Sequence, residues 1–246
     1  MNARENEQTL ILIKPDALKN SLTGFVLSQL SEFHTGLRFA GAKIVHVSRM
    51  LAEEHYAEHQ GKVFYPSLIE YIMGLIHYPE EPRRRRVIAL VYQGEDAVKK
   101  IRDICGPTNP HVAREKRPGC IRALGTIVPL KDSAGNDIGE RMDNLIHASA
   151  SDSEAEREIK LWFRPSDFPP FMRSFPTEVN EQDYYYFKDG TFFMTHEPGS
   201  VCLIAPGEVV WKSDLEVLRS LRQGSAVSSS MRAVAAKYLI NYTVEK

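Results

Sequence analysis

A solitary histidine, His147, precedes a run of small hydroxyl residues and a strong helix signal in the segment NLIHASASDSEAEREIKLWF (residues 144–163). Ser151 and Ser153 each stand three residues before a glutamate, which fits the S-x-x-E capping box that begins many helices. The unpaired N–H groups and the dipole of a helix N-terminus favour a phosphate or another anion. We therefore expect His147 to lie just before a helix N-terminus, at an anion-binding position.

Cationic and polar residues near other predicted loops and helix ends could complete a phosphate site. Phosphoryl transfer asks a protein mainly for positioning and for positive charge around the equatorial oxygens. A histidine must be neutral to attack phosphorus, and the ordinary imidazole pKa of about 6.5 leaves it mostly neutral at pH 7. The candidate residues are Lys14 in IKPDA, Arg102 and Thr108 in KKIRDICGPTNP, Arg122 in RPGCIRALG and Asn144 in NLIH.

The segment HYAEH (residues 55–59) matches the H-x-x-E-H pattern of inverted zinc peptidases, with His55 and His59 one helical turn apart. The sequence offers no obvious third ligand for a zinc ion. Two histidines on an exposed, glutamate-rich helix face are most often solvated surface residues. A zinc hydrolase is therefore kept as the third hypothesis.

Two other segments resemble phosphate-binding or nucleic-acid-binding motifs. GLRFAGAK (residues 36–43) has Ala42 where a Walker A loop needs its lysine, so side chains rather than a backbone loop must hold any phosphates. RRRR (residues 83–86) follows two glutamates in a chain of net charge −1. This context favours a solvated loop over a nucleic-acid contact.

The composition is typical of a globular protein, with 43% hydrophobic and 26% charged residues among 246. The polar N-terminus MNARENEQ lacks the apolar stretch of a signal peptide, and the longest apolar runs are far shorter than a membrane span. Three cysteines without C-x-x-C spacing argue against a disulfide framework and a thiolate zinc site. We expect a cytoplasmic protein with no membrane or specific nucleic-acid partner.

The order of predicted elements indicates an α+β fold. Apolar runs, alternation and helical spacing predict strands at 9–14, 38–50, 87–94 and 144–146 and helices near 25–36, 51–59, 65–73 and 94–106. This order fits a split β-α-β arrangement, a ferredoxin-like antiparallel sheet with helices on its faces.

Four prolines in RPSDFPPFMRSFP (residues 164–176) mark a boundary, so we predict domains at 1–171 and 172–246. The second part carries an Asp-Gly hairpin signal in YYYFKDGTFFM (residues 184–194). A capping box at Ser213 and a stop at Gly224 predict a helix. We expect an α+β extension of hairpins and two helices.

Five motifs in one order carry a family resemblance: LIKPDAL, the EEHY that begins at Glu53, GPTNP (106–110), RPGCIRA (117–123) and NLIHASASDSEAEREIKLWF. Over residues 9–171 the chain resembles the nucleoside diphosphate kinase family. The resemblance implies that family's ferredoxin-like core and ping-pong transfer of a terminal phosphoryl group from a nucleoside triphosphate to a diphosphate. It also implies a phosphohistidine intermediate and Mg²⁺ bound through the nucleotide phosphates.

The resemblance also assigns roles to individual residues. It makes His147 the nucleophile, with Glu158 orienting the imidazole and Ser149 as a polar support. It makes Phe64 the aromatic side chain on which the base stacks, and it replaces the zinc role of HYAEH with a nucleotide role for Tyr56. The residues that would hold the phosphates and sugar are Lys14, Tyr56, Arg102, Thr108, Arg122 and Asn144.

The chain departs from the family pattern at several places. Ala148 and Ala150 replace a glycine and an acidic residue, and segments near 74–86 and 124–141 are enlarged, the second by a hairpin around 133–136. The resemblance places the second enlargement in a loop that borders the active site, but neither enlargement touches a matched site residue, so activity is expected to survive. The resemblance implies a homo-oligomer built on a dimer, and these additions leave a hexamer open. The alternative function is a non-catalytic nucleotide-binding or sensor module whose tail binds a partner.

Overall fold

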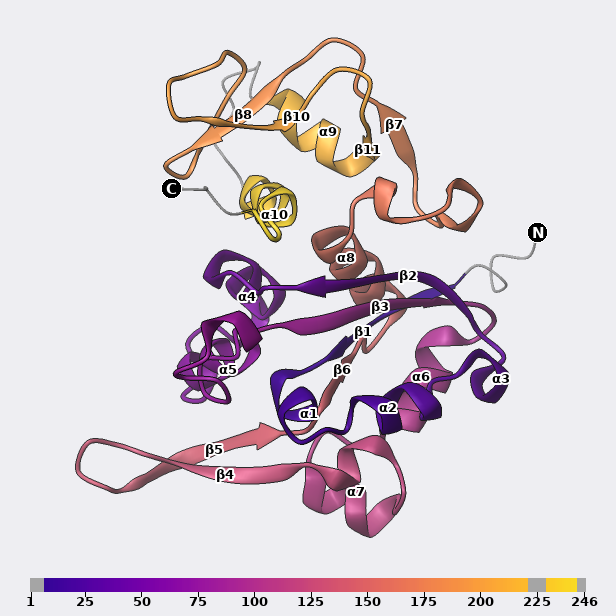
Figure 1. Cartoon of the computed structure of the whole chain (residues 1–246), viewed down its shortest axis with the longest axis vertical. Coiled ribbons are helices and arrows are strands. Elements are labelled where there is room, and N and C mark those ends of the chain that lie inside the picture. Colours follow the sequence, from indigo (N-terminus) through magenta and orange to yellow (C-terminus); the bar gives the residue numbers. More distant parts are fainter. Residues whose placement is uncertain (1–6, 221–228, 243–246) are drawn as a thin grey trace.

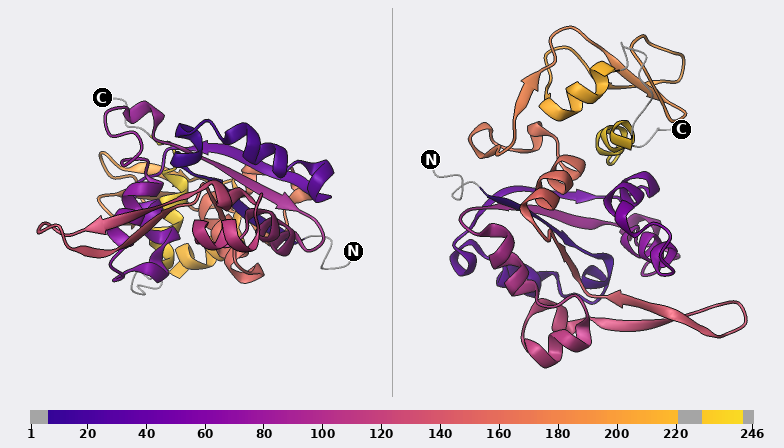
Figure 2. Two further views of the ribbon diagram at one scale, coloured as in Figure 1. Left: turned by 90° about the horizontal axis from the view of Figure 1, so that it is seen from below. Right: turned by 180° about the vertical axis from the view of Figure 1, so that it is seen from behind.

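A four-stranded antiparallel sheet forms the centre of the computed structural model, which describes residues 7–220 and 229–242. Its strands lie in the order β2 (Arg38–Val45), β3 (Val87–Gln93), β1 (Gln8–Ile13) and β6 (Ile146–Ala148). Strand β1 is buried along its whole length, because helices cover both faces of the sheet (Figures 1 and 2). The apolar runs that predicted β1 and β3 therefore reflect two-sided burial.

Side chains of β1 alternate between two hydrophobic clusters. Leu10 and Leu12 join a cluster with residues of α4 (Arg49–His55), α5 (Tyr65–Ile72) and α8 (Asp152–Trp162). Ile11 and Ile13 join the opposite cluster with residues of α2 (Thr23–Gln29) and α6 (Ala97–Cys105). The ferredoxin-like α+β fold predicted from the element order is confirmed. The remaining core helices are α1 (Pro15–Lys19), α3 (Glu32–Thr35), α7 (Pro110–Lys116) and the 3-10 turns Ala57–His59, Pro82–Arg84 and Ile121–Leu124.

Several predicted elements have other bounds in the structure. The strand expected at 38–50 ends at Val45, and the helix expected near 51–59 begins at Arg49 and ends at His55. The helix expected near 25–36 is two helices, because the Ser31 hydroxyl accepts a hydrogen bond from His34 N and starts α3, and Phe33 is 98% exposed. The last strand lies at Ile146–Ala148 rather than 144–146. Leu145 has a φ of 69°, so the chain turns there before it pairs with β1.

The enlargement near 124–141 forms the expected hairpin, β4 (Thr126–Lys131) and β5 (Asp137–Asp143), which projects from the body of the molecule (Figures 1 and 2). The arginine run at 83–86 lies at a short 3-10 turn on the surface before β3, as the solvated-loop interpretation predicts. Across residues 7–220 and 229–242, no helix is long and apolar enough to span a bilayer.

The C-terminal extension is an α+β unit, as predicted. After the 3-10 turns Pro165–Asp167 and Pro170–Met172, strands β10 (Val201–Ile204), β8 (Tyr185–Lys188) and β9 (Thr191–Phe193) form a sheet, and β11 (Val209–Trp211) pairs with β7 (Thr177–Val179). Asp189 and Gly190 both have positive φ, which confirms the predicted hairpin turn.

In the described part of the extension, the strands are followed by the helices α9 (Lys212–Arg219) and α10 (Ser229–Tyr238). The predicted cap at Ser213 is wrong, because α9 begins one residue earlier and follows directly from β11. The predicted stop at Gly224 lies outside the described residues.

The extension packs on the core through shared hydrophobic residues. Trp211 and Ala236 belong to the same cluster as Leu10 and Leu12 of β1, and the Trp211 indole donates a 2.8 Å hydrogen bond to the Phe163 carbonyl. Helix α10 contributes side chains both to this cluster and to the extension's own cluster, and it lies between the two parts (Figure 1). The division into domains at 171/172 stays a prediction.

Candidate active site

His147 lies on the edge strand β6, opposite Leu12 of β1. The two neighbours of His147 are buried, and its own side chain stays partly accessible. The sequence predicted His147 just before a helix N-terminus, and the structure places it on a paired strand, five residues before α8 begins at Asp152. Ala148 shares this extended backbone, a conformation that does not require the glycine usual in the family.

Helix α8 begins at Asp152, and the Ser151 hydroxyl accepts a hydrogen bond from Glu154 N. The first of the two predicted capping serines is thus confirmed, and Ser153 instead lies inside the first turn. The Glu154 carboxylate reaches back to Ala150 N at 3.1 Å. This carboxylate therefore satisfies a backbone donor just before the helix.

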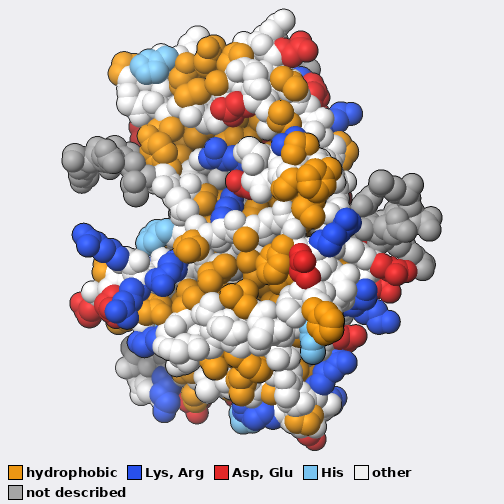
Figure 3. Space-filling view, turned by 45° about the vertical axis from the view of Figure 1, so that its right-hand side comes forward, with side chains coloured by type: hydrophobic (Ala, Val, Ile, Leu, Met, Phe, Trp, Pro, Cys, Tyr) orange, Lys and Arg blue, Asp and Glu red, His pale blue; other side chains and the backbone are white. Residues whose placement is uncertain are grey.

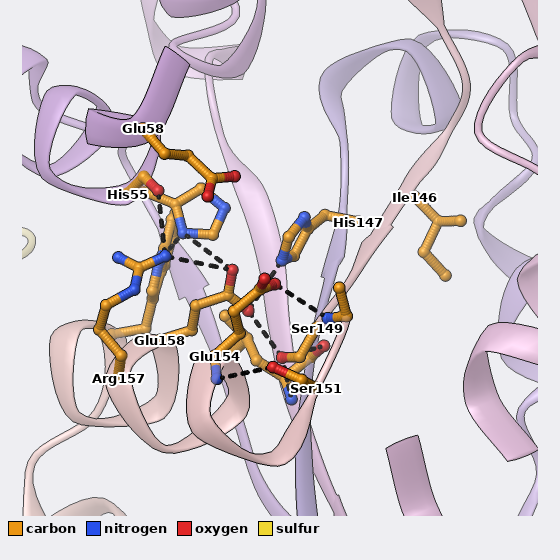
Figure 4. Close-up of polar contacts among 12 residues, drawn as sticks. His55, Glu58, Ile146, His147, Ser149, Ser151, Glu154, Arg157 and Glu158 are labelled. Carbon is orange, nitrogen blue, oxygen red and sulfur yellow. Dashed lines mark hydrogen bonds and ion pairs between the residues drawn. The ribbon is translucent and has the colours of Figure 1, made fainter. Parts of the chain in front are cut away.

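Glu158 of α8 directly contacts the imidazole of His147 (Figure 4). Its Oε2 atom lies 2.9 Å from His147 Nε2 and accepts a 2.6 Å hydrogen bond from the Ser149 hydroxyl. Burial raises the pKa of Glu158, but His147, His55 and Ser149 outweigh burial and lower the pKa to about 2. Glu158 is therefore ionised near neutral pH, and its carboxylate can accept a hydrogen bond from the His147 imidazole.

His55 is a site residue whose position the sequence interpretation missed. It is 2% exposed, and its ring centroid lies 4.5 Å from that of His147, nearly perpendicular to it (Figure 4). The Trp162 indole donates a 3.2 Å hydrogen bond to His55 Nδ1. Burial, reinforced by His147, holds the pKa of His55 well below the ordinary histidine value. A neutral imidazole therefore packs against His147, where an exposed surface histidine was expected.

The structure separates the two histidines of the HYAEH segment. Helix α4 ends at His55, and His59 lies on the following 3-10 turn, where it stacks on Tyr56. Within the described ranges, the histidine, cysteine and acidic ligand atoms that gather within 4.8 Å come from His55, His147 and Glu158, without His59. The H-x-x-E-H zinc hypothesis thus has no support.

Lys14 and Asn144 form a buried polar link beside His147. The Lys14 ammonium donates a 2.5 Å hydrogen bond to Asn144 Oδ1, and the Asn144 amide donates a 2.8 Å bond to the Thr108 carbonyl. Burial, only partly countered by Asp16, lowers the pKa of Lys14 to about 8. These bonds hold an ammonium group in the wall of the cavity that His147 faces.

Arg122 is fixed by backbone carbonyls. Its guanidinium donates a 2.8 Å hydrogen bond to Gly106 O and longer bonds to Ile146 O, and burial lowers its pKa. Gly106 ends α6 and Ile146 begins β6, so Arg122 ties the loop after α6 to the histidine strand. Arg102, from the last turn of α6, is half-buried and faces the same space.

One cavity of about 440 Å³ collects most of the predicted residues. Glu158 and Ser149 lie behind His147 rather than in the cavity wall. The predicted residues that line it are Lys14, Tyr56, Phe64, Arg102, Thr108, Arg122, Asn144 and His147.

The β4–β5 hairpin also lines this cavity. Glu140, Arg141 and Met142 of β5 contribute to its wall, and Arg141 is held by a 2.7 Å bond to Asp143 and a 3.3 Å bond to Ser67. The enlarged segment had been expected to border the active site without touching a matched residue, and Arg141 of this segment lines the cavity beside those residues. Its signal was the charged sequence GERMD, which lies directly before Asn144.

Comparisons with known proteins find similarity to nucleoside diphosphate kinases. The family model described as nucleoside diphosphate kinase matches residues 7–168. A nucleoside diphosphate kinase of Pyrococcus furiosus is 36% identical over 170 residues, which are 69% of this chain and 91% of that protein. One of Staphylococcus aureus (strain JH9) is 39% identical over 165 residues, which are 67% of this chain and 93% of that protein.

Solved structures of the same kind superpose on the core. The nucleoside diphosphate kinase of Aquifex aeolicus has a TM-score of 0.52 at 30% identity and covers 66% of this chain and 99% of its own. That of Halobacterium salinarum in complex with CDP has a TM-score of 0.51 at 31% identity, with coverages of 67% and 91%.

These matches identify the chain as a nucleotide phosphotransferase. More specifically, the chain belongs to the nucleoside diphosphate kinase family. The predicted family, fold class and enzyme activity are thereby confirmed.

Proposed function

We propose that this nucleoside diphosphate kinase carries its phosphoryl group on Nδ1 of His147. The observation that supports this assignment is the 2.9 Å contact between His147 Nε2 and Glu158. An acceptor at Nε2 favours the tautomer with the proton on Nε2 and the lone pair on Nδ1. The imidazole is therefore oriented as a nucleophile that faces the cavity, with a carboxylate behind it.

In the first half-reaction, Nδ1 attacks the γ-phosphorus of a nucleoside triphosphate. The bond to the β–γ bridging oxygen breaks, the nucleoside diphosphate leaves with that electron pair, and a phosphohistidine forms. Positive charge that develops on the ring is stabilised through Nε2 by Glu158. A second nucleoside diphosphate then attacks the phosphohistidine, and the reverse bond changes restore free His147.

The cations of the cavity place positive charge around the phosphoryl group that is transferred. Lys14, Arg102 and Arg122 surround the space in front of His147, and Lys14 and Arg122 are held by hydrogen bonds before substrate arrives. Fixed charges in a partly enclosed site stabilise a transition state without reorganisation. Thr108 and Tyr56 supply hydroxyl groups, and Phe64 offers a π face on which any base can stack.

Mg²⁺ is expected to arrive on the nucleotide rather than to reside in the protein. Mg²⁺ usually binds through one or two carboxylates together with substrate phosphates. Glu58, Glu140 and Glu154 bring carboxylates to the cavity wall, so the oxygen donors there fit a metal–nucleotide complex. The metal would neutralise phosphate charge that the lysine and arginines do not reach.

A homo-oligomer built on a dimer belongs to the same proposal. Phe33 and Ile44, near the edge strand β2, are large apolar side chains exposed in the single chain, which fits a surface covered by another copy. Sedimentation at several protein concentrations measures this directly. A cytoplasmic location stays a prediction.

The phosphohistidine assignment is tested with γ-labelled ATP. We expect acid-labile, alkali-stable label on the wild-type chain and none on His147→Asn. The matched control is His111→Asn, which changes an exposed histidine on α7 outside the cavity. Label that persists on His147→Asn would refute the assignment. Nucleotide binding without label on the wild type would favour the sensor alternative.

A further inference from the structure

A second cavity, of about 390 Å³, lies where the extension meets the kinase core. Its walls come from α4 and the turn after it, from α8, and from both helices of the extension. Leu161, Val217 and Val234 give it a largely apolar lining. Lys and Arg side chains lie among apolar ones along this junction in the space-filling view (Figure 3).

Most charged groups in this cavity already have a partner. Lys237, 1% exposed, is ion-paired with Asp214 of α9. Lys160 pairs with a glutamate one helical turn earlier, and the Glu54 carboxylate lies 3.4 Å from Arg232. These pairs neutralise the charges that the extension and the core bring together.

Arg157 is the lining cation with only long contacts. Its guanidinium lies 3.4 Å from the carbonyls of Glu54 and His55 and 3.7 Å from Oε1 of Glu158 (Figure 4). Charge-assisted bonds of arginine to a carboxylate are normally about 2.7–2.9 Å. The guanidinium therefore has capacity for a closer anionic partner, and about half of its side chain is exposed.

We propose that this cavity binds a small organic anion with an apolar body, such as a medium-chain carboxylate, whose charge pairs with Arg157. The hydrocarbon part would lie against Leu161, Val217 and Val234, and the Ser213 hydroxyl in the wall offers a further donor. Most of this cavity's boundary comes from the extension and from α8, so the site exists only because this chain carries the extension.

The bound anion would act on His147 through Glu158, a step that rests on the proposed function. An anion that draws Arg157 toward it removes positive charge from Oε1 of Glu158. Glu158, whose Oε2 atom orients the His147 imidazole, would then be held less firmly, and a less well oriented imidazole attacks phosphorus more slowly. Binding would therefore slow phosphotransfer.

Binding is tested by calorimetry on the full-length protein with sodium octanoate, and 1-octanol serves as the uncharged probe of equal chain length. We expect octanoate to bind at least about tenfold more tightly than octanol. Ala233→Trp, which fills the cavity from α10, should abolish binding while keeping basal activity, and Val217→Trp from α9 should do the same. Thermal unfolding of both variants checks that they fold.

The kinetic arm measures phosphotransfer with and without octanoate. We expect roughly a twofold to fivefold slowing in the wild type, the size expected of a partly exposed ion pair. We expect none in Ala233→Trp. Activity without octanoate reports on the proposed kinase mechanism separately, so failure of one proposal is not confused with failure of the other.

Three results would overturn the proposal. The first is equal affinity for octanoate and octanol, because Arg157 would then have no part in binding. The second is binding that survives in folded Ala233→Trp and Val217→Trp. The third is displacement of octanoate by ADP with competitive kinetics, which would move the anion to the nucleotide cavity.

Discussion

The Nε2 atom of His147 and the Oε2 atom of Glu158 lie 2.9 Å apart, and the same oxygen accepts a hydrogen bond from Ser149. This contact sets which ring nitrogen faces the substrate. Glu158→Gln keeps the shape and an acceptor oxygen but removes the negative charge that stabilises the reacting imidazole. We expect kcat to fall about 10-fold to 100-fold with little change in KM, the usual cost of losing such a supporting group.

Ser149→Ala is the graded control for this prediction. It removes one donor to Glu158 and keeps the carboxylate, so its effect on kcat should be smaller than that of Glu158→Gln. Steady-state kinetics at saturating nucleotide compares the two. Unchanged kcat in Glu158→Gln would mean that His147 does not depend on this carboxylate.

The lowered pKa of Lys14 predicts that the enzyme loses affinity for nucleotide as the pH becomes alkaline. Burial lowers its pKa from 10.5 to about 8, so the free enzyme loses this positive charge as pH rises through about 8. KM for the nucleoside triphosphate should therefore rise between pH 8 and roughly pH 10. Lys14→Met should have a higher KM at pH 7 and a flatter profile. A wild-type KM that stays constant across this range contradicts the prediction.

The lowered pKa of Lys14 also predicts how the free energy of unfolding depends on pH. A folded-state pKa below the unfolded value means that the unfolded chain binds more protons between pH 8 and 10.5. The free energy of unfolding contributed by Lys14 therefore rises with pH over that window. Denaturant unfolding of the wild type and Lys14→Met should show the wild type gaining relative stability from pH 8 to 10. A constant or falling difference would exclude a depressed lysine pKa.

Substitution of Arg102 and of Arg122 should lower kcat in both cases, but only substitution of Arg122 should also lower the stability of the fold. Arg102→Ala is expected to lower kcat by about 10²-fold to 10³-fold with little effect on thermal unfolding, because it removes mainly transition-state charge. Arg122→Ala should lower kcat and also destabilise the fold by about 1–3 kcal/mol, since the carbonyls of Gly106 and Ile146 lose a buried donor. Loss of nucleotide affinity alone, with kcat intact, would remove the transition-state role.

The strands β1 and β3 could be predicted from sequence because a short, continuous apolar run between polar segments is typical of a strand buried on both faces. Strand β6 could not be placed correctly, since three residues of IHA carry little local preference and become extended by pairing with Leu12 and its neighbours. The predicted strand, 144–146, therefore ended one residue before His147. Its chemistry was predictable from residue type and family resemblance, and its support by a strand was not.

The burial of His55 was also beyond sequence reasoning. Its environment is made by Trp162, 107 residues away in the chain, and by His147, so no local pattern distinguishes it from a surface histidine. The contribution of Arg141 to the cavity has a similar origin. Arg141 reaches the site because β5 pairs with β4 in a hairpin that lies in an enlarged segment of this chain, and a family pattern cannot assign it.

Trp211 provides a test of whether the extension and the core unfold together. Its side chain is 1% exposed, lies in the cluster that contains β1 residues and bonds to the Phe163 carbonyl. Trp211→Ala should cost about 3–5 kcal/mol, the range for deleting a buried aromatic side chain. Because the cluster is shared, spectroscopic unfolding and loss of kinase activity should follow one transition. Val179→Ala, an exposed position in the same extension, should change stability by less than about 0.5 kcal/mol.

A chain shortened to residues 1–171 tests whether the core needs the extension for its stability. Removing the extension uncovers the apolar side chains that Trp211 and Ala236 contact, and it deletes the Asn241 side chain that bonds to Ile44 O and His46 N at the edge of β2. We expect this shortened chain to unfold at lower denaturant concentration and to aggregate more readily than the full chain, by light scattering. If it matches the full chain in stability and activity, residues 172–246 are an independent domain and the shared cluster contributes little to the fold.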